Sequence, residues 1–286
     1  MEFIRFNNLK SYRDAVIADL SKNEIRNSSE IQKISTWSEQ EFVDANGLFA
    51  VVKDNGKNAA IIFHAPPKEF NLYFIDNKFN STVAEFLIKS LVELNWKVEI
   101  VWADSETGLN FAKEYARITN QRYEQEETWF AYKLGKLQNV KKSDGKIRIA
   151  TKNDSYFIPY WWREFGAESG VGTGDELDIN NRINKFLKLK HDIVLFIDSD
   201  DIPVSMVGWK RISETLCRIG PVYTPPQFRR SGYATTAVCL LCEQLQTKYK
   251  DIMLLADADY PASNACYQKI GFERLFSMMQ YKIGQS

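Results

Sequence analysis

The sequence predicts an α/β protein with a mixed α+β sheet, in which one fold occurs twice in tandem. The chain has 286 residues, more than the about 100–200 of one typical domain. Strand-like and helix-like patterns fill both halves, and their order recurs after the polar, charged segment 135–145. We therefore expect a first domain at 1–134, a linker at 135–145 and a second domain at 146–286.

The first half is expected to begin with a strand at 3–6 and helical sequence to about residue 34. Residues 48–53 and 59–64 flank Asp54-Asn55-Gly56-Lys57, a turn sequence that predicts a β-hairpin. A strand at 71–75 precedes apolar residues spaced three and four apart, which predict a helix over 83–94. The half ends with three further elements, a strand at 98–102, a helix at 109–118 and a strand at 123–134.

The second half repeats this order. A strand at 146–150 is followed by a helix that Asp154 or Ser155 can cap, with Pro159 in its first turn. A flexible break at 166–174 and a helix at 177–189 come next. The remaining expected elements are strands at 193–197, 202–212 and 215–224, a helix at 232–248, a strand at 252–257, a helix at about 262–270 and a strand at 273–283.

The composition excludes several classes of protein. Lys+Arg and Asp+Glu balance at 37 each, so no net charge attracts nucleic acid or an acidic membrane. No signal peptide is apparent and no apolar stretch approaches the roughly 18 residues of a membrane span, which predicts a soluble, cytoplasmic protein. Cys239 and Cys242 fall in an apolar helix, remote from His64 and His191, so we expect buried thiols and no metal.

The loop after the strand at 215–224 carries the main functional signal. Pro225-Pro226 ends the strand, and the apolar spacing from Ala234 onward marks a helix. A helix that starts after Gly232 leaves backbone N–H groups unpaired beside Arg229 and Arg230. Gly232 also lets a ligand approach the main chain, because it has no Cβ. The loop therefore predicts an anion site of a size that suits a pyrophosphate.

Two motifs resemble the GNAT family of N-acetyltransferases. Arg229-x-x-Gly232-x-Ala234, preceded by Val222-x-x-Pro225, is similar to the family's acetyl-CoA signature, Q/R-x-x-G-x-G/A. The segment 255–272 is similar to its second signature, in which Asn264 and Tyr267 share a short helix that a Gly-Phe pair closes. The resemblance covers roughly the second half and implies a GNAT-like fold in two tandem copies.

The resemblance implies transfer of an acetyl group from acetyl-CoA, as co-substrate, to an amine by direct attack in a ternary complex. In the family, the strand before the loop diverges from its neighbour and the acyl-carrier arm lies in the gap, and Pro221 fits this divergence. Tyr267 is the implied catalytic residue, since the family uses a tyrosine to protonate the departing thiolate. The implied cofactor-binding residues are Val222, Thr224, Arg229, Arg230, Ser231, Gly232, Tyr233, Ala234, Thr235 and Asn264.

The general base and the acceptor stay open at this point. Glu164 and Glu168 could reach the acceptor cleft or could be surface acids. The aromatic run Tyr160-Trp161-Trp162, with Phe165, could bind a flat or apolar acceptor or could belong to the core. The expected partner is a small-molecule amine or a peptide N-terminus, with no nucleic acid and no membrane.

The first half is expected to be a degenerate copy without cofactor binding. Where the second half has Arg229-Arg230-Ser231-Gly232, the first has Asp76-Asn77-Lys78-Phe79-Asn80-Ser81, which contains no glycine. Its role could be packing, homodimer formation or shaping of the acceptor site. The alternative to an enzyme is a non-catalytic acyl-CoA-binding or assembly module. The missing base favours that alternative, whereas Tyr267 and the complete loop favour an enzyme.

Overall fold

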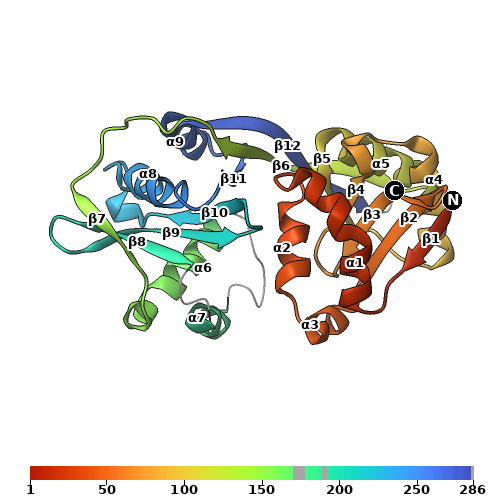
Figure 1. Cartoon of the computed structure of the whole chain (residues 1–286), viewed down its shortest axis with the longest axis horizontal. Coiled ribbons are helices and arrows are strands. Elements are labelled where there is room, and N and C mark those ends of the chain that lie inside the picture. The colour runs from red at the N-terminus through yellow and green to blue at the C-terminus, as the bar shows by residue number, and fades with distance from the viewer. Residues whose placement is uncertain (170–177, 189–191, 285–286) are drawn as a thin grey trace. The chain divides into compact units, whose positions relative to one another are not determined.

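The chain forms two compact units in the computed structural model, which describes residues 1–169, 178–188 and 192–284 (Figure 1). Unit 1 comprises Met1–Ala131 and Phe276–Ser286, and unit 2 comprises Tyr132–Leu275. The C-terminal end of the chain thus groups with unit 1 instead of with the expected second domain at 146–286. The reason is a non-local strand pairing in the sheet of unit 1.

The sheet of unit 1 has the strand order β1-β2-β3-β4-β5-β12. Neighbouring strands are antiparallel except for the parallel pair β4–β5. The last strand of the chain pairs with β5 from Met278↔Asp104 to Lys282↔Ile100, which explains the grouping of residues 276–286. The bounds are β1 Glu2–Arg5, β2 Leu48–Asp54, β3 Lys57–His64, β4 Phe70–Phe74, β5 Ile100–Asp104 and β12 Phe272–Gly284.

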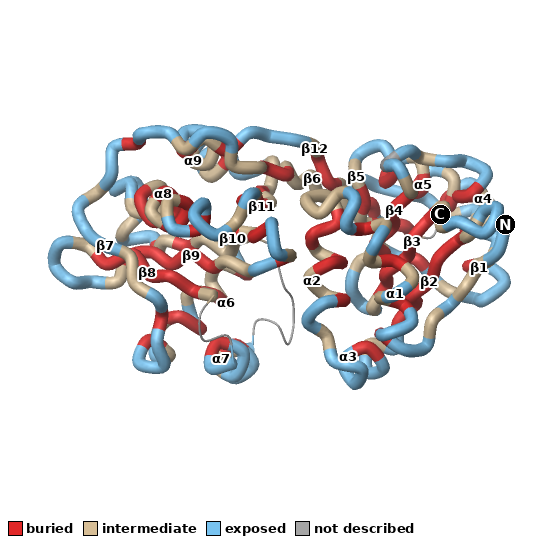
Figure 2. The backbone as a smooth tube through the Cα atoms, in the orientation of Figure 1, coloured by how far each residue is buried: buried red, intermediate tan, exposed pale blue. Residues whose placement is uncertain are grey.

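Helices cover both faces of this sheet. Side chains alternate along a strand, so Ile62 packs with α4 and α5 in one core, whereas Phe63 packs with Tyr12 of α1 on the other face. Both sets are buried, as the red segments of Figure 2 show along the central strands. The helices are α1 Leu9–Leu20, α2 Ser28–Thr36, α3 Glu39–Asp44, α4 Ser81–Glu93 and α5 Ser105–Thr119.

The sheet of unit 2 has the order β6-β11-β10-β9-β8-β7, and of β6 only Tyr132 to Leu134 belong to this unit. The strands are β6 Arg122–Leu134, β7 Gly145–Ile149, β8 Ile193–Asp198, β9 Pro203–Arg211, β10 Leu216–Tyr223 and β11 Asp251–Asp257. The helices are α6 Ile158–Glu168, α7 Ile179–Lys188, α8 Tyr233–Leu245 and α9 Pro261–Ile270. On one face, Trp162 of α6 and Phe186 of α7 form a core with Leu195 of β8.

Two local predictions in unit 2 are wrong. Asp154 does not cap a long helix, because it closes a capping box with Thr151 around the short 3₁₀ turn Lys152–Tyr156. The helix α6 starts later, at Ile158, with Pro159 in its first turn. Gly166 is buried inside α6 and begins no break, and residues 170–174 of the expected break lie outside the described residues.

The two units match strand by strand, which supports the tandem arrangement. Three antiparallel pairs are followed by one parallel pair both in β1-β2-β3-β4-β5 and in β7-β8-β9-β10-β11. Following the strand registers across unit 1 places four residues side by side, Ile4, Val51, Ile61 and Tyr73. The same count across unit 2 gives Arg148, Leu195, Met206 and Tyr223. Tyr73 lies on β4 and Tyr223 on β10, which are corresponding strands of the two sheets.

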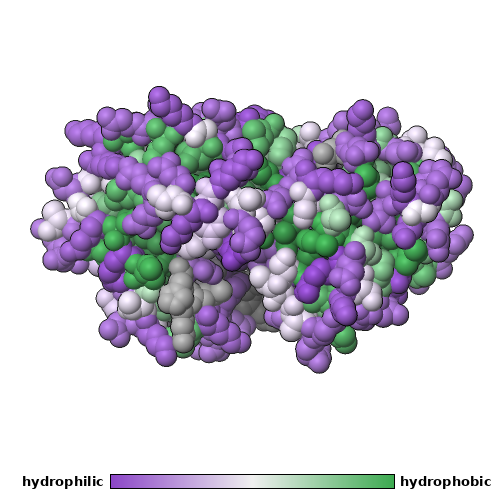
Figure 3. Space-filling view, viewed as in Figure 1, coloured by the Kyte–Doolittle hydropathy of each residue, from purple (hydrophilic) through white to green (hydrophobic). Residues whose placement is uncertain are grey.

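Hydrophilic residues cover much of the face shown in Figure 3, as is usual for a protein surface in contact with water. In the described residues, none of the helices combines the length and the apolar character that crossing a bilayer needs.

Candidate active site

The central strands of unit 2 run parallel and then separate. The parallel register of β10 and β11 ends at Ile219↔Leu254, although both strands continue beyond that pair. On its other side, β10 stays paired with β9 as far as Tyr223↔Met206. The register with β9 shifts at Gly220-Pro221, where Gly220 has a φ of +137° that favours glycine. The expected divergence of β10 from its parallel neighbour is confirmed.

Helix α8 begins beside this divergence with open backbone donors. Its N-cap is Gly232, with φ +78° and ψ 2°, and no side chain among the described residues caps the helix. The first hydrogen bond within the helix runs from the N–H of Thr236 to the carbonyl of Gly232, at 3.0 Å. The N–H groups of the first turn, before Thr236, therefore have no carbonyl partner within the helix. Arg230 also has a positive φ, +64°, so the turn into the helix is tight. The first turn of α8 thus offers N–H groups and the positive end of a helix dipole.

Unit 1 lacks this feature at the equivalent helix. The helix α4 starts after Asn80, whose Oδ1 accepts hydrogen bonds from the N–H groups of Thr82 and Val83, each at 3.1 Å. A side chain of the protein therefore uses the donors that α8 leaves open. This difference agrees with a degenerate first copy.

Arg229 is held within the protein by three interactions. Its Nη2 lies 2.8 and 2.6 Å from the two carboxylate oxygens of Glu168, and its Nε donates to the carbonyl of Thr224 at 2.8 Å. Its guanidinium carbon lies 5.6 Å from the centroid of the Tyr223 ring. The side chain of Arg229 therefore fixes the shape of the loop. From the motif alone, Arg229 was expected to bind the anionic cofactor. Arg230 is exposed and has no ion-pair partner within the part of the chain that the structure describes.

The segment before β7 lies against the same loop. The hydroxyl of Ser143 donates to the carbonyl of Ser231 at 2.8 Å, and the N–H of Ser143 donates to Oγ1 of Thr236 at 2.9 Å. The segment 135–145, expected only as a linker, therefore supports the start of α8. Sequence reasoning missed this role, because a polar segment carries no pattern that names its contacts.

Glu168, at the end of α6, connects both sides of the strand divergence. The hydroxyl of Tyr223, at the end of β10, lies 3.4 Å from the Glu168 carboxylate. The hydroxyl of Tyr260, which follows β11, donates to the backbone carbonyl of Glu168. Burial and the Glu168 charge raise the pKa of Tyr223, so its hydroxyl stays protonated at neutral pH.

Asn264 is buried in α9 and its amide is bound inside the unit. Its Nδ2 donates to the carbonyls of Asp257 and Tyr260 at 2.7 and 2.9 Å. Its Oδ1 accepts from the hydroxyl of Tyr132 at 3.0 Å. Both N–H donors are thus used by the turn that joins β11 to α9, so Asn264 fixes the start of that helix.

Tyr267 follows one turn later on α9, as expected. Its ring lies 6.4 Å from that of Tyr132 and 6.1 Å from that of Phe272, centroid to centroid. Burial, with a smaller contribution from Cys266, raises the pKa of Tyr267. The neighbouring Cys266 lies 3.1 Å from Oγ1 of Thr235, in the first turn of α8. The structure therefore brings the helix of Tyr267 against the helix with open N–H donors.

The other candidates from the sequence divide into core and surface residues. Trp162 is buried in the core under α6, with the Arg182 guanidinium 5.2 Å from its ring. Tyr160, two residues earlier, is 43% exposed. Glu164 forms a partly exposed ion pair with Arg163 at 2.8 Å.

The cysteines are free, and Cys239 and Cys242 are buried, as predicted; Cys217 is buried too. Burial raises the pKa of Cys217 to about 12 and also raises that of Cys242. In residues 1–169, 178–188 and 192–284, no group of three or more His, Cys, Asp or Glu side chains is placed to hold a metal ion.

Comparisons with known proteins identify the fold. Residues 198–281 match the model of a family described as FR47-like protein. No curated protein sequence matches the chain. Among solved structures, a GNAT acetyltransferase from Colwellia psychrerythraea is 10% identical over 100% of both chains, with a TM-score of 0.61.

Two further structures have a similar fold. A GCN5-related N-acetyltransferase from Sphaerobacter thermophilus has a TM-score of 0.59 at 12% identity, over 99% of this chain and 96% of its own. A tandem GNAT protein from the clavulanic acid biosynthesis pathway has a TM-score of 0.58 at 9% identity, over 99% and 98%. The chain therefore has the GNAT fold in a tandem, two-copy arrangement, which confirms the resemblance seen in its motifs.

Proposed function

We propose that unit 2 is an N-acetyltransferase that binds acetyl-CoA and transfers its acetyl group to an amine. The observation that carries the proposal is the open N-terminus of α8 at Gly232, beside the point where β10 leaves β11. A diphosphate requires several N–H donors that it can approach closely, and a helix that begins at glycine without a side-chain cap supplies them.

In this proposal the backbone from Arg230 to Thr235 holds the diphosphate, and Val222 and Thr224 line the gap in which the acyl-carrier arm lies. The side chain of Arg229 orders the loop through Glu168, and its positive charge adds to the local field. Asn264 positions α9, because both of its N–H donors bind the backbone turn before that helix.

Acetyl-CoA supplies the acyl group when it is bound. The protein must then place the amine near the thioester and provide a proton to the departing sulfur. Tyr267 is the proposed proton donor, since a phenol with a raised pKa stays protonated near neutral pH. We propose a small-molecule amine or a peptide N-terminus as the acceptor.

The test is calorimetric titration of the full chain with coenzyme A, comparing two glycine variants. Gly232→Ala places a Cβ at a φ of +78° in the donor loop, and Gly56→Ala places one at a φ of +77° in the β2–β3 turn. Both carry a similar backbone strain of about 1–2 kcal/mol. Gly232→Ala is expected to weaken binding about tenfold or more, while Gly56→Ala binds as the wild type does. A wild-type chain that ignores coenzyme A refutes the proposal.

One observation favours the second candidate, an acyl-CoA-binding module without catalysis. Both glutamates considered as a base are engaged in ion pairs, Glu164 with Arg163 and Glu168 with Arg229. Thiol release from acetyl-CoA in the presence of a panel of amines separates the two functions. If the chain binds coenzyme A but releases no thiol from acetyl-CoA with any of the amines, the result favours the binding module.

A further inference from the structure

Two positive charges lie directly opposite each other on one face of the sheet of unit 2. They belong to Lys210 of β9 and Arg218 of β10, which are partners in the antiparallel register of these strands. Residues in this relationship point to the same face, with their Cβ atoms about 4.5–5.5 Å apart. Like charges at such positions destabilise a sheet, so the stability of the fold does not explain the pair.

The pair lies on the face of the sheet that α6 and α7 cover, whereas α8 lies on the other face (Figure 1). Met206 and Lys210 are four residues apart on β9 and therefore point the same way. Met206 packs in one core with Trp162 of α6 and Phe186 of α7. The helix α7 also contributes Lys185, whose Nζ lies 5.3 Å from the centroid of the Trp162 ring. This face thus carries positive charge from both the strands and a helix.

The ammonium group of Lys210 has no counter-charge bound to it. Its side chain is partly buried, and within the part of the chain that the structure describes it makes no hydrogen bond and no ion pair. Burial lowers the pKa of Lys210, and the charges of Arg218 and Lys185 lower it further. Asp192 raises this pKa, but by less than either cation lowers it. The charges that act on Lys210 are therefore mainly positive and would stabilise an anion beside it.

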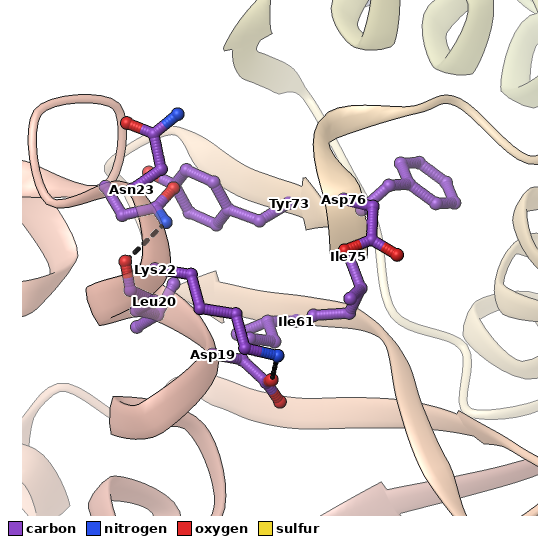
Figure 4. A pocket seen from close by; sticks show the side chains of 10 residues that line it. Asp19, Leu20, Lys22, Asn23, Ile61, Tyr73, Ile75 and Asp76 are labelled. Carbon is purple, nitrogen blue, oxygen red and sulfur yellow. Dashed lines mark hydrogen bonds and ion pairs between the residues drawn. The ribbon is translucent and has the colours of Figure 1, made fainter.

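A lysine that lines a pocket of unit 1 differs in this respect. That pocket, of about 310 Å³, lies at the end of β4, and Asp19 and Lys22 are among its lining residues. The ammonium of Lys22 lies 2.7 Å from the Asp19 carboxylate (Figure 4). The protein itself already neutralises this positive charge, so the pocket of unit 1 has less to offer an anion than Lys210 has.

Lys210 lies close to the point where β10 diverges from β11. Gly208 precedes it by two residues on the same face of β9. A Cβ at Gly208 would lie 2.8 Å from the carbonyl oxygen of Gly220 and 2.8 Å from Cδ of Pro221. Two residues of an extended strand span about 7 Å, so a short molecule can reach from Gly220 to Lys210.

The acyl end of the proposed cofactor points to the same place. In the proposed function, the diphosphate is held at the start of α8, and the acyl-carrier arm passes Thr224 and then Val222. An arm that continues in this direction along β10 brings its acyl group toward Gly220. An amine that attacks the acyl group there has Lys210 and Arg218 within reach of a substituent a few bonds away.

We propose that the acceptor amine carries an anionic group, a carboxylate or a phosphate, which binds between Lys210 and Arg218. This inference rests on the proposed acyltransferase function, because that function places the amine at the acyl end of the arm. The bound anion offsets the repulsion between the two cations, which gives the pair a role in substrate selection.

Binding is tested by NMR on the full chain with coenzyme A present and with lysine labelled at Cε. The probes are glycine, β-alanine, 4-aminobutanoate and 6-aminohexanoate, each compared with its amide, and O-phosphoethanolamine compared with ethanolamine. Loss of a signal in Lys210→Arg assigns Lys210. At least one acid or the phosphate should shift this signal saturably, and its neutral counterpart should bind about fivefold or more weakly. The two kinds of pair show whether carboxylate or phosphate is preferred.

Thiol release from acetyl-CoA with the same compounds tests the consequence for catalysis. Each acid differs from its amide in amine basicity, so the measure is the acid-to-amide ratio of kcat/KM in the wild type divided by that ratio in Lys210→Gln. We expect a quotient of about five or more for the preferred acid. Lys210→Arg keeps the positive charge and should retain most of the preference. The control is Lys248→Gln, at an exposed lysine after α8, which should behave as the wild type does.

Two results overturn the inference. One is a Lys210 signal that no acid and no phosphate shifts saturably, and the other is an acid-to-amide ratio that Lys210→Gln leaves unchanged. Failure of the proposed function has a separate signature, because the calorimetric titration with coenzyme A uses no acceptor and does not depend on Lys210.

Discussion

Tyr73 and Tyr223 lie on corresponding strands of the two sheets, and the hydroxyl of each bonds to a glutamate from the helices after the unit's first strand. Tyr73 donates to Glu30 of α2, which is completely buried. Tyr223 pairs with Glu168 of α6, whose side chain is 40% exposed and also binds Arg229. The tyrosine–glutamate pair is thus buried in the core of unit 1 and connected to the donor loop in unit 2.

We predict that Glu168→Gln weakens coenzyme A binding by roughly threefold to tenfold, because the loop loses the ion pair that orders it before binding. Since both side chains are about 40% exposed, the cost in folding free energy should stay below about 1 kcal/mol. Calorimetry and denaturant unfolding measure the two quantities.

The matched control is Glu164→Gln, which removes the ion pair with Arg163 on the same helix. This variant should bind coenzyme A as the wild type does. Equal effects of the two variants on affinity would show that Arg229 does not order the loop.

Tyr267→Phe should lower the turnover rate of acetyl transfer about 100-fold or more, because it removes the proposed proton donor. The ring contacts with Tyr132 and Phe272 remain, so stability and coenzyme A affinity should change little. Thiol release with a reactive amine measures the rate. Tyr249→Phe, which keeps the ring contact with Trp209, is the control. Turnover by Tyr267→Phe at the wild-type rate would remove this residue from the mechanism.

Asn80→Ala should destabilise unit 1 by about 1 kcal/mol, because it removes the side-chain cap of α4. Asn80→Asp keeps an acceptor oxygen in the same place and should restore most of the loss. Hydrogen exchange of the amides of Thr82 and Val83 reports the change locally. If the alanine variant were as stable as the wild type, the two hydrogen bonds would not contribute to stability.

The stability of unit 1 should fall as the pH drops from about 6.5 to about 4. Burial lowers the pKa of His64 to about 4, although its hydrogen bond to the carbonyl of Lys68 opposes this. The ordinary value of histidine is about 6.5, so in this window the unfolded chain binds a proton that the folded chain does not. The loss should reach roughly 3 kcal/mol and level off below pH 4.

Unfolding of the wild type and of His64→Gln between pH 4 and 7 isolates this contribution. The variant lacks the titrating ring, so its stability should fall less over the same interval. In the neutral ring of His64, Nδ1 accepts a hydrogen bond from the Nε1–H of Trp96 at 2.9 Å. Protonation of Nδ1 would break this hydrogen bond. Parallel pH curves for the two proteins would contradict the prediction.

Much of the fold follows from local patterns. The turn at Asp54-Asn55-Gly56-Lys57 and the apolar spacing from Ala234 fixed a hairpin and a helix near their observed bounds. The short helix α3 was missed, although its capping box between Ser38 and Glu41 is a recognisable start signal.

The candidate site could be predicted only where local sequence determines the backbone conformation. A glycine after two prolines and before an apolar helix specifies an uncapped helix start, whatever surrounds it. The partners of Arg229 could not be foreseen, because Glu168 lies 61 positions away in the sequence. The position of Asn264 on α9 was predicted, but its partners were not, because the hydroxyl that donates to its Oδ1 belongs to Tyr132, on a distant strand.

The strand pairing of β12 with β5 sets an order for synthesis of the protein. A ribosome produces Met278 to Lys282 only after the whole of unit 2 has been translated. Until then the edge of β5 has no antiparallel neighbour, whereas unit 2, which ends at Leu275, is already complete. The copy that is encoded first is therefore the last to finish its sheet as the chain leaves the ribosome.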